Sequence, residues 1–292
     1  MRVELRCAVN DLIRIRRANT PAIATASWPP MKFSIVTTVL NGASFIGATV
    51  ASVLAQTHED FDYVIVDAGS TDGTQDIVSA LIRDDARATL KSAPGAGMYR
   101  AILDGLSQAR GGMLAWINAD DLYTPWAFGR VAAYCAVHDN AQWVTGLPAA
   151  WDDKGSLTMV RPQGAHPQRL IRDGWFHRDL LGFLQQESMF FSADLFARLT
   201  KEDLDHIASF RLAGDYARWR RFARHAPLET IPTVLGGFRR HAGNRSIAGM
   251  SDYMEEVRRE GATFLPWPLT PLARRIYWLS AAEAARRAAA ET

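Results

Sequence analysis

Cysteine is nearly absent from this chain of 292 residues, which contains only Cys7 and Cys135. The two are far apart and lie in no metal-binding or redox motif, so the sequence predicts neither a disulfide framework nor a zinc site. Apolar runs of about 18 residues, the length that crosses a bilayer, are absent as well. Charged residues also interrupt the apolar cluster near the N-terminus, which excludes an uninterrupted signal-peptide core. We therefore expect a protein of a reducing, cytoplasmic compartment.

A strong net charge is missing too. The chain has 33 Lys and Arg against 31 Asp and Glu, a formal net charge of +2, and so small an excess excludes a dedicated nucleic-acid binder. The excess is local, because residues 1–30 carry +3, residues 31–246 carry −1 and residues 247–292 are neutral. Trp28-Pro29-Pro30 separates the basic segment from the first strand-like run. The sequence therefore predicts a basic N-terminal extension over residues 1–30, outside the fold, and a folded domain from residue 31.

From residue 32, short apolar runs alternate with segments of helical periodicity. Strands are predicted at 33–39, 63–66, 88–90 and 113–117, with a helix between each pair. This alternation indicates an α/β fold with a mostly parallel central sheet flanked by helices. Because ligands of open α/β sheets bind where the parallel strands end, the polar loops that follow these strands are the first candidates for a functional site.

Beyond residue 140 this alternation is lost. Scattered strands are predicted at 188–191 and 230–235, and a hairpin turn at 152–155. Thr270 and Pro271 mark the start of a C-terminal helix rich in Ala and Arg. We therefore divide the folded part into a domain over 31–246 and a C-terminal helical extension over 247–292. The neutral charge of this extension favours an ordinary helix packed on the domain over one that docks on a membrane surface.

Two adjacent carboxylates, Asp120 and Asp121, follow the predicted strand at 113–117. Adjacent acids at a buried strand end repel one another unless a cation or hydrogen-bond donors compensate them. Oxygen ligands of this kind suit Mg²⁺ or Mn²⁺, which keep coordination positions open for phosphate oxygens. The alternative is structural, with Asp121 capping a helix that begins near Pro125.

Three further polar segments carry candidate chemistry. Asp67 opens a loop of Gly, Ser, Thr and Asp that suits the close approach of a nucleotide, although such loops are more often ordinary turns. Asp215 stands at the start of a predicted helix, either as an acid that the helix dipole favours or as a general base. Arg239 and His241 follow a predicted strand, either to hold a diphosphate or a metal ion or as solvated loop charges.

Together these segments resemble family 2 glycosyltransferases of the GT-A fold. The resemblance covers about residues 32–246 and rests on six segments in the family's order: Ser34–Asn41, Gln56–Thr74, Trp116–Asp121, Gln185–Glu187, Gly214–Tyr216 and Phe238–His241. It implies a non-processive, inverting transfer of one sugar from a nucleotide-diphosphate donor, with Mn²⁺ or Mg²⁺ as cofactor. The acceptor it implies is a hydroxyl group of a surface glycan or of a lipid-linked sugar.

The resemblance also implies roles for individual residues. Asp215 would be the catalytic base. Asp121 would be the more direct metal ligand, with Asp120 nearer the ribose and sugar and His241 as a further ligand. The donor nucleotide would contact Thr37, Thr38, Asp67, Ser70, Asp120 and Arg239. The acceptor or the donor sugar would contact Gln185, Gln186 and Glu187.

The sequence departs from the family pattern at two points. Arg100 and Leu103 stand where many relatives have an acid and an amide, so donor recognition near that helix differs. The Gln-x-x-Arg-Trp motif of processive relatives is missing, which indicates transfer of a single sugar.

Two alternatives stay open. A nucleotidyltransferase of similar fold would need a basic residue in the turn at 40–44, which has none. The second alternative is a catalytically silent protein that binds a sugar nucleotide or acts as a scaffold. The location we expect is cytoplasmic, with a peripheral contact at the inner face of the membrane as a secondary expectation.

Overall fold

The computed structural model describes residues 28–161 and 166–290 of the chain. Residues 1–27, most of the predicted basic extension, lie outside the described residues. Trp28, near the end of that extension, packs on the fold: its Nε1–H donates to Thr57 Oγ1 at 3.2 Å. A Cβ added to Gly129 would come within 2.2 Å of the Trp28 ring, so the ring lies directly on the helix that contains Gly129.

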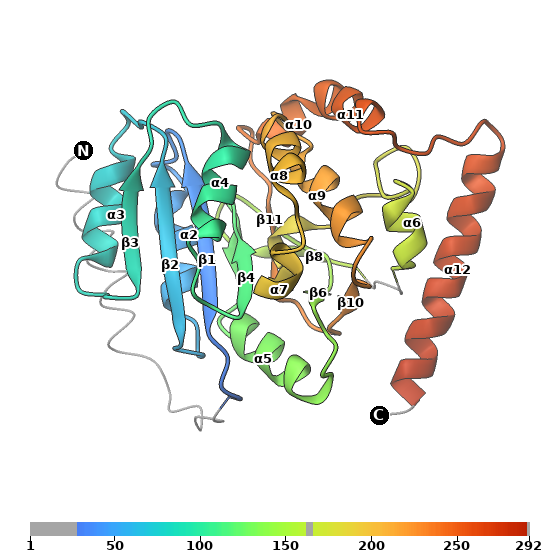
Figure 1. The fold of residues 1–292 in the computed structure, drawn as a ribbon, viewed down its shortest axis with the longest axis horizontal. Helices are drawn as coiled ribbons and strands as arrows, with labels where there is room; N and C mark the ends of the chain where they lie inside the picture. The colour runs from blue at the N-terminus through green and yellow to red at the C-terminus, as the bar shows by residue number, and fades with distance from the viewer. Residues whose placement is uncertain (1–27, 162–165, 291–292) are drawn as a thin grey trace.

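A seven-stranded sheet runs through the centre of the molecule (Figure 1). Its strand order is β10-β6-β9-β4-β1-β2-β3, and β4, β1, β2 and β3 are mutually parallel. Strand β9 is antiparallel to both β4 and β6. The strands are β1 (Phe33–Val39), β2 (Phe61–Asp67), β3 (Ala88–Ser92), β4 (Met113–Trp116), β6 (Trp143–Thr145), β9 (Phe190–Ser192) and β10 (Glu229–Thr230). The predicted α/β fold with a mostly parallel sheet is thus confirmed.

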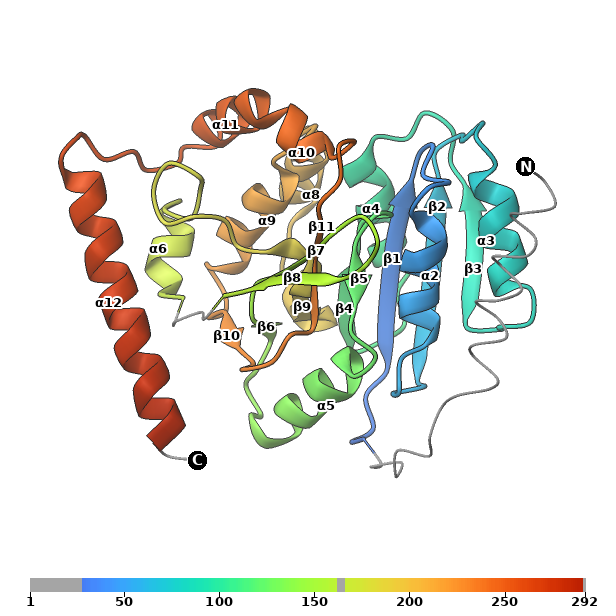
Figure 2. The ribbon, with the colours of Figure 1, turned by 180° about the vertical axis from the view of Figure 1, so that it is seen from behind.

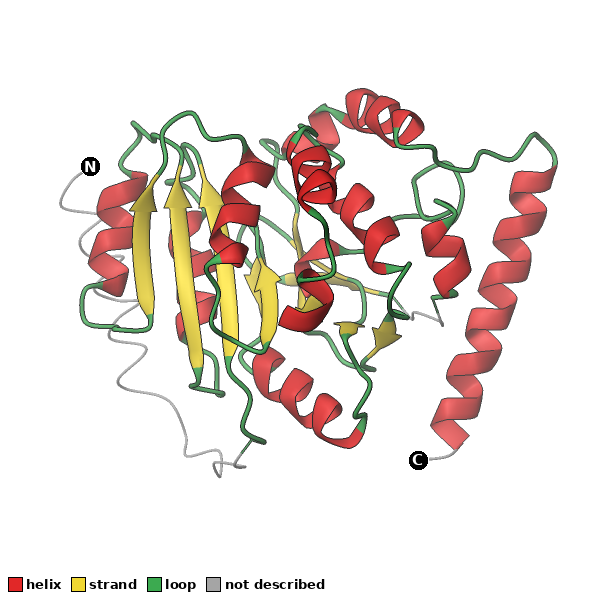
Figure 3. Cartoon of the chain, viewed as in Figure 1, coloured by secondary structure: helices red, strands yellow, loops and turns green. Residues whose placement is uncertain are grey.

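Helices cover both faces of this sheet (Figure 3). Because successive side chains of a strand point to opposite faces, β1 contributes to two separate cores. Phe33, Ile35 and Val39 pack with α2 (Ile46–Leu54), α3 (Thr74–Ile82) and α5 (Ala127–Val137). Val36 packs on the other face with α4 (Met98–Ser107), α8 (Lys201–Ala208) and α9 (Gly214–Phe222).

A second, four-stranded sheet has the order β5-β11-β7-β8. It comprises β5 (Leu122–Tyr123), β7 (Ala149–Trp151), β8 (Leu157–Val160) and β11 (Gly236–Arg239). The predicted hairpin turn at 152–155 is confirmed between β7 and β8, where Asp152 accepts hydrogen bonds from the backbone of Lys154 and Ser156. The predicted strand over 230–235 is wrong: β10 ends at Thr230 and β11 begins at Gly236. Pro232 lies in the gap and has no N–H to donate to a ladder.

The remaining helices are short or C-terminal. They are α6 (Gln168–Arg172), α7 (Ala193–Phe196), the single 3₁₀ turn η1 (Gln186–Ser188), α10 (Arg245–Ala248), α11 (Met250–Arg259) and α12 (Leu269–Ala290). Helix α11 shares a buried cluster with Tyr216 of α9, through Tyr253, Met254 and Val257, so it packs as part of the main domain.

Helix α12 lies along one edge of the molecule (Figure 2). Its Tyr277 is buried in the larger core, and Arg274 donates hydrogen bonds to the carbonyls of Leu180 and Arg178. None of the helices in the described ranges is both long and apolar enough to cross a membrane.

Candidate functional site

A pocket of about 300 Å³ opens where β1 and β4 end, as expected for an open α/β sheet. Seven parts of the chain line it: the end of β1 with its following loop, the start of α4, the end of β4 with its following loop, η1, the start of α9 with the loop before it, the end of β11 with the segment after it, and α11 (Met250–Arg259). The lining side chains that can carry chemistry are Asp120, Glu187, Asp215, His241 and Arg245. The tertiary structure therefore gathers five of the six segments that carry the family resemblance around one cavity, all except Gln56–Thr74.

The two adjacent aspartates face in different directions. Asp121 is fully buried, and its oxygens accept hydrogen bonds from the Arg239 backbone N–H at 2.8 Å and from the Asn118 amide at 3.0 Å. It ties β11 to the end of β4 and does not cap α5, whose N-cap is Trp126. Asp120 lines the pocket. Asp120, and not Asp121, therefore lines the pocket, whereas the prediction made Asp121 the more direct metal ligand.

The electrostatics of Asp121 agree with a structural role. Burial raises the pKa of Asp121 well above its ordinary value, and the nearby charges of Glu187 and Asp120 raise it further. The hydrogen bonds from Arg239 and Asn118 act in the opposite direction. The fold thus holds Asp121 through a hydrogen bond to each of its two carboxylate oxygens.

His241 holds Asp120 at the pocket wall. Its Nε2 lies 2.9 Å from Asp120 Oδ2, and its ring stacks on Phe45 at a centroid distance of 4.0 Å. Because the Gly243 N–H donates to Nδ1 at 3.1 Å, the ring hydrogen of the neutral imidazole is assigned to Nε2. In this conformation His241 donates to Asp120, and it would have to release Gly243 before Nε2 could bind a metal ion.

Asp215 lies at the start of α9, on the opposite part of the same pocket. The hydroxyl of Tyr99 donates to the Leu212 carbonyl at 2.6 Å and lies 3.4 Å from Asp215 Oδ1. Burial raises the pKa of Asp215 to about 6, although the Tyr216 N–H and the charge of Arg218 lower it. A half-buried carboxylate with this pKa is ionised near neutral pH and still basic enough to take a proton.

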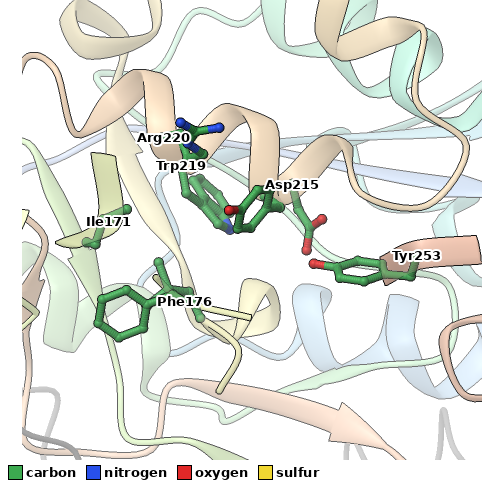
Figure 4. A pocket seen from close by; sticks show the side chains of 8 residues that line it. Ile171, Phe176, Asp215, Trp219, Arg220 and Tyr253 are labelled. Carbon is green, nitrogen blue, oxygen red and sulfur yellow. The ribbon is translucent and has the colours of Figure 1, made fainter. Parts of the chain in front are cut away.

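A small cavity of about 10 Å³ adjoins Asp215 on the side of α6 and α11. Figure 4 shows the Asp215 carboxylate and the Tyr253 hydroxyl pointing toward one another across it. Phe176, Trp219 and Ile171 supply apolar walls. The base candidate is therefore bordered by the ligand pocket and by an aromatic recess.

Glu256 of α11 fixes the loop that leads to Asp215. Its two carboxylate oxygens accept hydrogen bonds from the backbone N–H groups of Arg211, Leu212 and Ala213, at 2.8–3.0 Å. These donors precede the first turn of α9 and would otherwise lack helical partners. Sequence reasoning missed Glu256 and Tyr253, because more than 35 residues separate them from Asp215 and no local pattern connects the segments.

Gly214 permits the close approach of α9 and α4. A Cβ at this position would come within 2.6 Å of the Tyr99 ring. We expect Gly214→Ala to displace the start of α9, destabilising the fold by about 1–3 kcal/mol and lowering turnover through Asp215. Chemical denaturation and steady-state kinetics would test this, with Gly112→Ala as a control because nothing lies within 4 Å of its Cβ. Equal effects of the two substitutions would contradict the prediction.

Two of the three predicted sugar contacts, Gln186 and Glu187, line the pocket. Gln185 exchanges both of its amide hydrogen bonds with the backbone of Ala149. Gln186 accepts from Asn118 and donates to the Trp116 carbonyl, so it braces the loop after β4. Glu187 lines the pocket between Asp120 and Asp215, and burial raises its pKa to about 7, with the charges of Asp215 and Asp120 adding to the effect.

The predicted nucleotide contacts divide in the same way. Thr38 lines the pocket, whereas Thr37 is fully buried, donates to the Ile117 carbonyl and accepts from Tyr63. Ser70 accepts from the Asn41 N–H and so joins the two loops at this edge. Of the predicted threonine pair, only Thr38 is placed to touch a ligand.

Asp67 is buried at the end of β2, beside Val39 of β1. Its Oδ1 accepts from the N–H groups of Gly69 and Ser70 and from the Gln75 amide. Burial raises the pKa of Asp67, but these hydrogen bonds outweigh it and hold the pKa below its usual value. Its Oδ2 has no hydrogen-bond partner among the residues that the structure describes. A buried carboxylate oxygen without a donor is a candidate for binding a ligand N–H.

Arg239 is the last residue of β11, and Arg245 is the first residue of α10. Arg239 is buried, with its guanidinium 5.3 Å from the Phe45 ring, and its Nε and Nη2 find no acceptor in the described part of the chain. Arg245 is exposed and lines the pocket. Arg245 was not among the predicted contacts, although its place in an arginine-rich loop was a usable signal.

The residues fit a hard divalent cation through Asp120. Within 28–161 and 166–290, no three His, Cys, Asp or Glu side chains form a complete metal site. Asp120 accepts hydrogen bonds from His241 and from Asn244, and both bonds end on Oδ2. Neither of them occupies Oδ1. One carboxylate ligand is enough where substrate phosphates complete the coordination of Mg²⁺ or Mn²⁺.

Curated proteins with sequences similar to part of this chain are named glycosyltransferases. A PGL/p-HBAD biosynthesis glycosyltransferase of Mycobacterium tuberculosis is 36% identical over 116 residues, 39% of this chain and 45% of that protein. The chain thus spans less than half the length of this curated relative. Among solved structures, TarS of S. aureus in complex with UDP-GlcNAc has a TM-score of 0.58 at 15% identity, over 85% of this chain and 72% of that one.

A second structural neighbour covers nearly the whole chain. The mannosyltransferase PcManGT from Pyrobaculum calidifontis, in complex with GDP-Man and Mn²⁺, has a TM-score of 0.57 at 17% identity, over 99% of this chain and 86% of that one. At these identities the two structures show a shared GT-A-like fold. The sequence profile described as Glycosyl transferase family 2 matches residues 34–212. Because that match covers more than half of the sequence, this chain belongs to glycosyl transferase family 2.

Proposed function

We propose that this protein transfers a single sugar from a nucleoside-diphosphate donor to a hydroxyl acceptor, with inversion and with the help of a divalent cation. The observation that carries the proposal is that one pocket holds both the Asp120–His241 pair and the Asp215 carboxylate. A leaving diphosphate and an attacking hydroxyl need charge stabilisation and a base at the same sugar. We include a surface glycan or a lipid-linked sugar as the acceptor in this proposal.

Asp215 is the proposed base. The acceptor hydroxyl transfers its proton to Asp215 while its oxygen bonds to the anomeric carbon. The bond from that carbon to the diphosphate oxygen breaks, and its electron pair leaves with the diphosphate. Attack from the face opposite the leaving group inverts the configuration. The pKa of Asp215, about 6, suits proton transfer near neutral pH.

The donor diphosphate would lie between Asp120 and Arg245. Asp120 would hold the Mn²⁺ or Mg²⁺ ion, and His241 would orient Asp120 through its Nε2 hydrogen. Bound there, the ion would neutralise negative charge on the leaving diphosphate. Arg245 would contact phosphate oxygens directly, because a guanidinium binds them with two parallel hydrogen bonds.

Asp67 supports a preference among nucleotide bases. Its unpartnered Oδ2 needs an N–H donor. Uracil, thymine and guanine each present a ring N–H, whereas the corresponding nitrogen of cytosine is an acceptor. We therefore propose a uridine, thymidine or guanosine diphosphate sugar. The UDP-GlcNAc and GDP-Man complexes of the two structural neighbours agree with this choice.

A thermal-shift screen tests the donor. We expect UDP, dTDP or GDP sugars to raise the melting temperature in the presence of Mn²⁺, because a ligand that binds only the folded state stabilises it by mass action. CMP sugars should cause no shift. An assay for release of the nucleoside diphosphate, with water or a sugar as acceptor, would then distinguish an enzyme from a silent binding protein. A stabilising effect of CMP sugars alone would contradict the proposed role of Asp67.

A further inference from the structure

Arg218 is a buried cation without a hydrogen-bond partner. It lies on α9, three residues after Asp215, and its side chain is 0% exposed. Its Nε, Nη1 and Nη2 meet no acceptor among the residues described in the structure. The guanidinium carbon lies 4.1 Å from the centre of the Trp116 ring and 5.9 Å from that of Phe191. Aromatic faces attract a cation but accept none of its five N–H groups.

Burying a charge in this way opposes folding. Removing an ion from water is costly unless an opposite charge and hydrogen bonds compensate it. Arg221, on the same helix, shows the usual arrangement: Nε donates to Asp203, and Nη1 donates to the Ala217 carbonyl and to Glu260. Arg218 lacks such partners, so ion pairing within the fold does not explain its presence.

The groups that favour the charged form of Arg218 are Tyr99 and Asp215, and of these Asp215 is the one that is ionised near neutral pH. Residues three apart on a helix lie on the same side, so the guanidinium is placed behind the carboxylate that faces the pocket. The titratable and charged groups that face Asp215 are Tyr99 from α4, Glu187 from η1, Tyr253 from α11, and Arg218 and Arg220 from α9 itself. Arg220 is engaged elsewhere, with the carbonyls of Arg172 and Glu260.

We propose that Arg218 is a positioning residue that keeps Asp215 ionised in a pocket whose burial favours the protonated acid. The inference rests on the proposed role of Asp215 as the base. Arg218 touches no substrate, because neither cavity beside Asp215 is lined by it. It acts through its charge, which attracts the Asp215 carboxylate and opposes the effect of burial.

The ionisation states agree with this role. Burial lowers the pKa of Arg218 to about 10, so the guanidinium stays charged at neutral pH. The pKa of Asp215 is about 6, with Arg218 among the groups that lower it. Without the Arg218 charge, only hydrogen bonds would counteract the rise in the pKa of Asp215 that burial causes. The Asp215 carboxyl would then take up its proton at a higher pH.

The test compares Arg218→Met and Arg218→Lys with the wild-type enzyme. For Arg218→Met we expect the acidic limb of the kcat/KM profile to move upward by about 1 pH unit or more, the scale of a close opposite charge. Turnover at pH 7 should fall by at least about twofold, because a base whose pKa has risen from about 6 to about 7 is only about half ionised at that pH. The melting temperature should stay constant or rise, because methionine fills much of the space without an unpaired charge. Arg218→Lys, which restores a cation, should return the limb toward its original position.

Arg221→Met is the matched control on the same helix. It leaves Glu260 with a lost partner and should lower the melting temperature, without moving the acidic limb. A lower melting temperature of Arg218→Met with an unmoved pH profile would show that Arg218 is structural, and would overturn the inference. That result is distinguishable from failure of the proposed function, which Asp215→Asn reports: near-normal turnover of Asp215→Asn removes the base, whatever Arg218 does.

Discussion

Replacing Asp215 by Asn is expected to reduce turnover by about two orders of magnitude or more, the usual contribution of a positioned general base. The amide has nearly the same shape but cannot take a proton from the acceptor hydroxyl. Donor binding should remain close to that of the wild type, because the proposed donor contacts, Asp120 and Arg245, are unchanged in this variant. The substitution also removes a carboxylate whose pKa burial raises to about 6, so the fold should be no less stable.

Steady-state kinetics and calorimetric titration of the nucleotide test this expectation together. Asp104→Asn is a suitable control, because Asp104 is an exposed acid of α4 whose 3.9 Å contact with Arg100 contributes little. Near-normal turnover of Asp215→Asn would exclude it as the base. Loss of nucleotide binding in the same variant would instead assign Asp215 to the donor site.

The pH dependence of the wild-type enzyme follows from the same group. The active form of a base is ionised, so kcat/KM should fall as the pH falls through about 6, the raised pKa of Asp215. Above that value the acidic limb should reach a plateau. An acidic limb near 4, the ordinary value of an aspartate, would show that the buried environment of Asp215 does not persist in the working enzyme.

The second large effect is expected at Asp120. Asp120→Asn should weaken Mn²⁺-dependent binding of the nucleoside diphosphate by at least about tenfold, because an amide is a poor ligand for a hard cation. Its stability should change little, since the side chain is partly exposed and an amide oxygen can still accept from His241 and Asn244. Titration with and without Mn²⁺ measures this effect.

Asp121→Ala is expected to lower stability rather than Mn²⁺-dependent binding. It would leave the Arg239 N–H and the Asn118 amide without their acceptor, at a cost of about 1–3 kcal/mol for each buried group. We therefore expect a lower melting temperature in Asp121→Ala and a binding defect in Asp120→Asn. If Asp121→Ala kept its stability and alone lost Mn²⁺-dependent binding, the assignment of the two residues would be reversed.

Local patterns predicted much of the sheet and of the site. The apolar run at 33–39 is β1, with the bounds that the pattern predicts, because a strand buried on both faces needs no partner information to be recognised. The acids after β2 and β4 lie at one sheet edge because parallel strands end there together. The error at 230–235 came from treating an apolar run as continuous across Pro232, where β10 ends and a separate sheet begins.

The sequence did not show which side chains point into the pocket or which groups they bind. Nothing in Asn118-Ala119-Asp120-Asp121 shows which acid is buried, because that choice depends on the Arg239 N–H, 118 residues away in the chain. Thr37 and Gln185 are predicted ligand contacts, yet their polar atoms are hydrogen-bonded within the fold. Thr37 bonds to the Tyr63 hydroxyl and Gln185 to the Ala149 backbone. The role of Glu256 at the start of α9 depends on the packing of α11, which no local pattern predicts.

The sequence by itself determined the alternating α/β fold, the family, and the set of segments that meet at the strand ends, because periodicity and motif order are local properties of the chain. Only the tertiary structure decided that Asp120 lines the pocket while Asp121 holds β11, that Gln186 and Glu187 but not Gln185 line the same pocket, and that Arg218 is fully buried. The physical reason is that burial, charge and hydrogen-bond partnership are properties of neighbours in space, and for these residues the neighbours are distant in sequence.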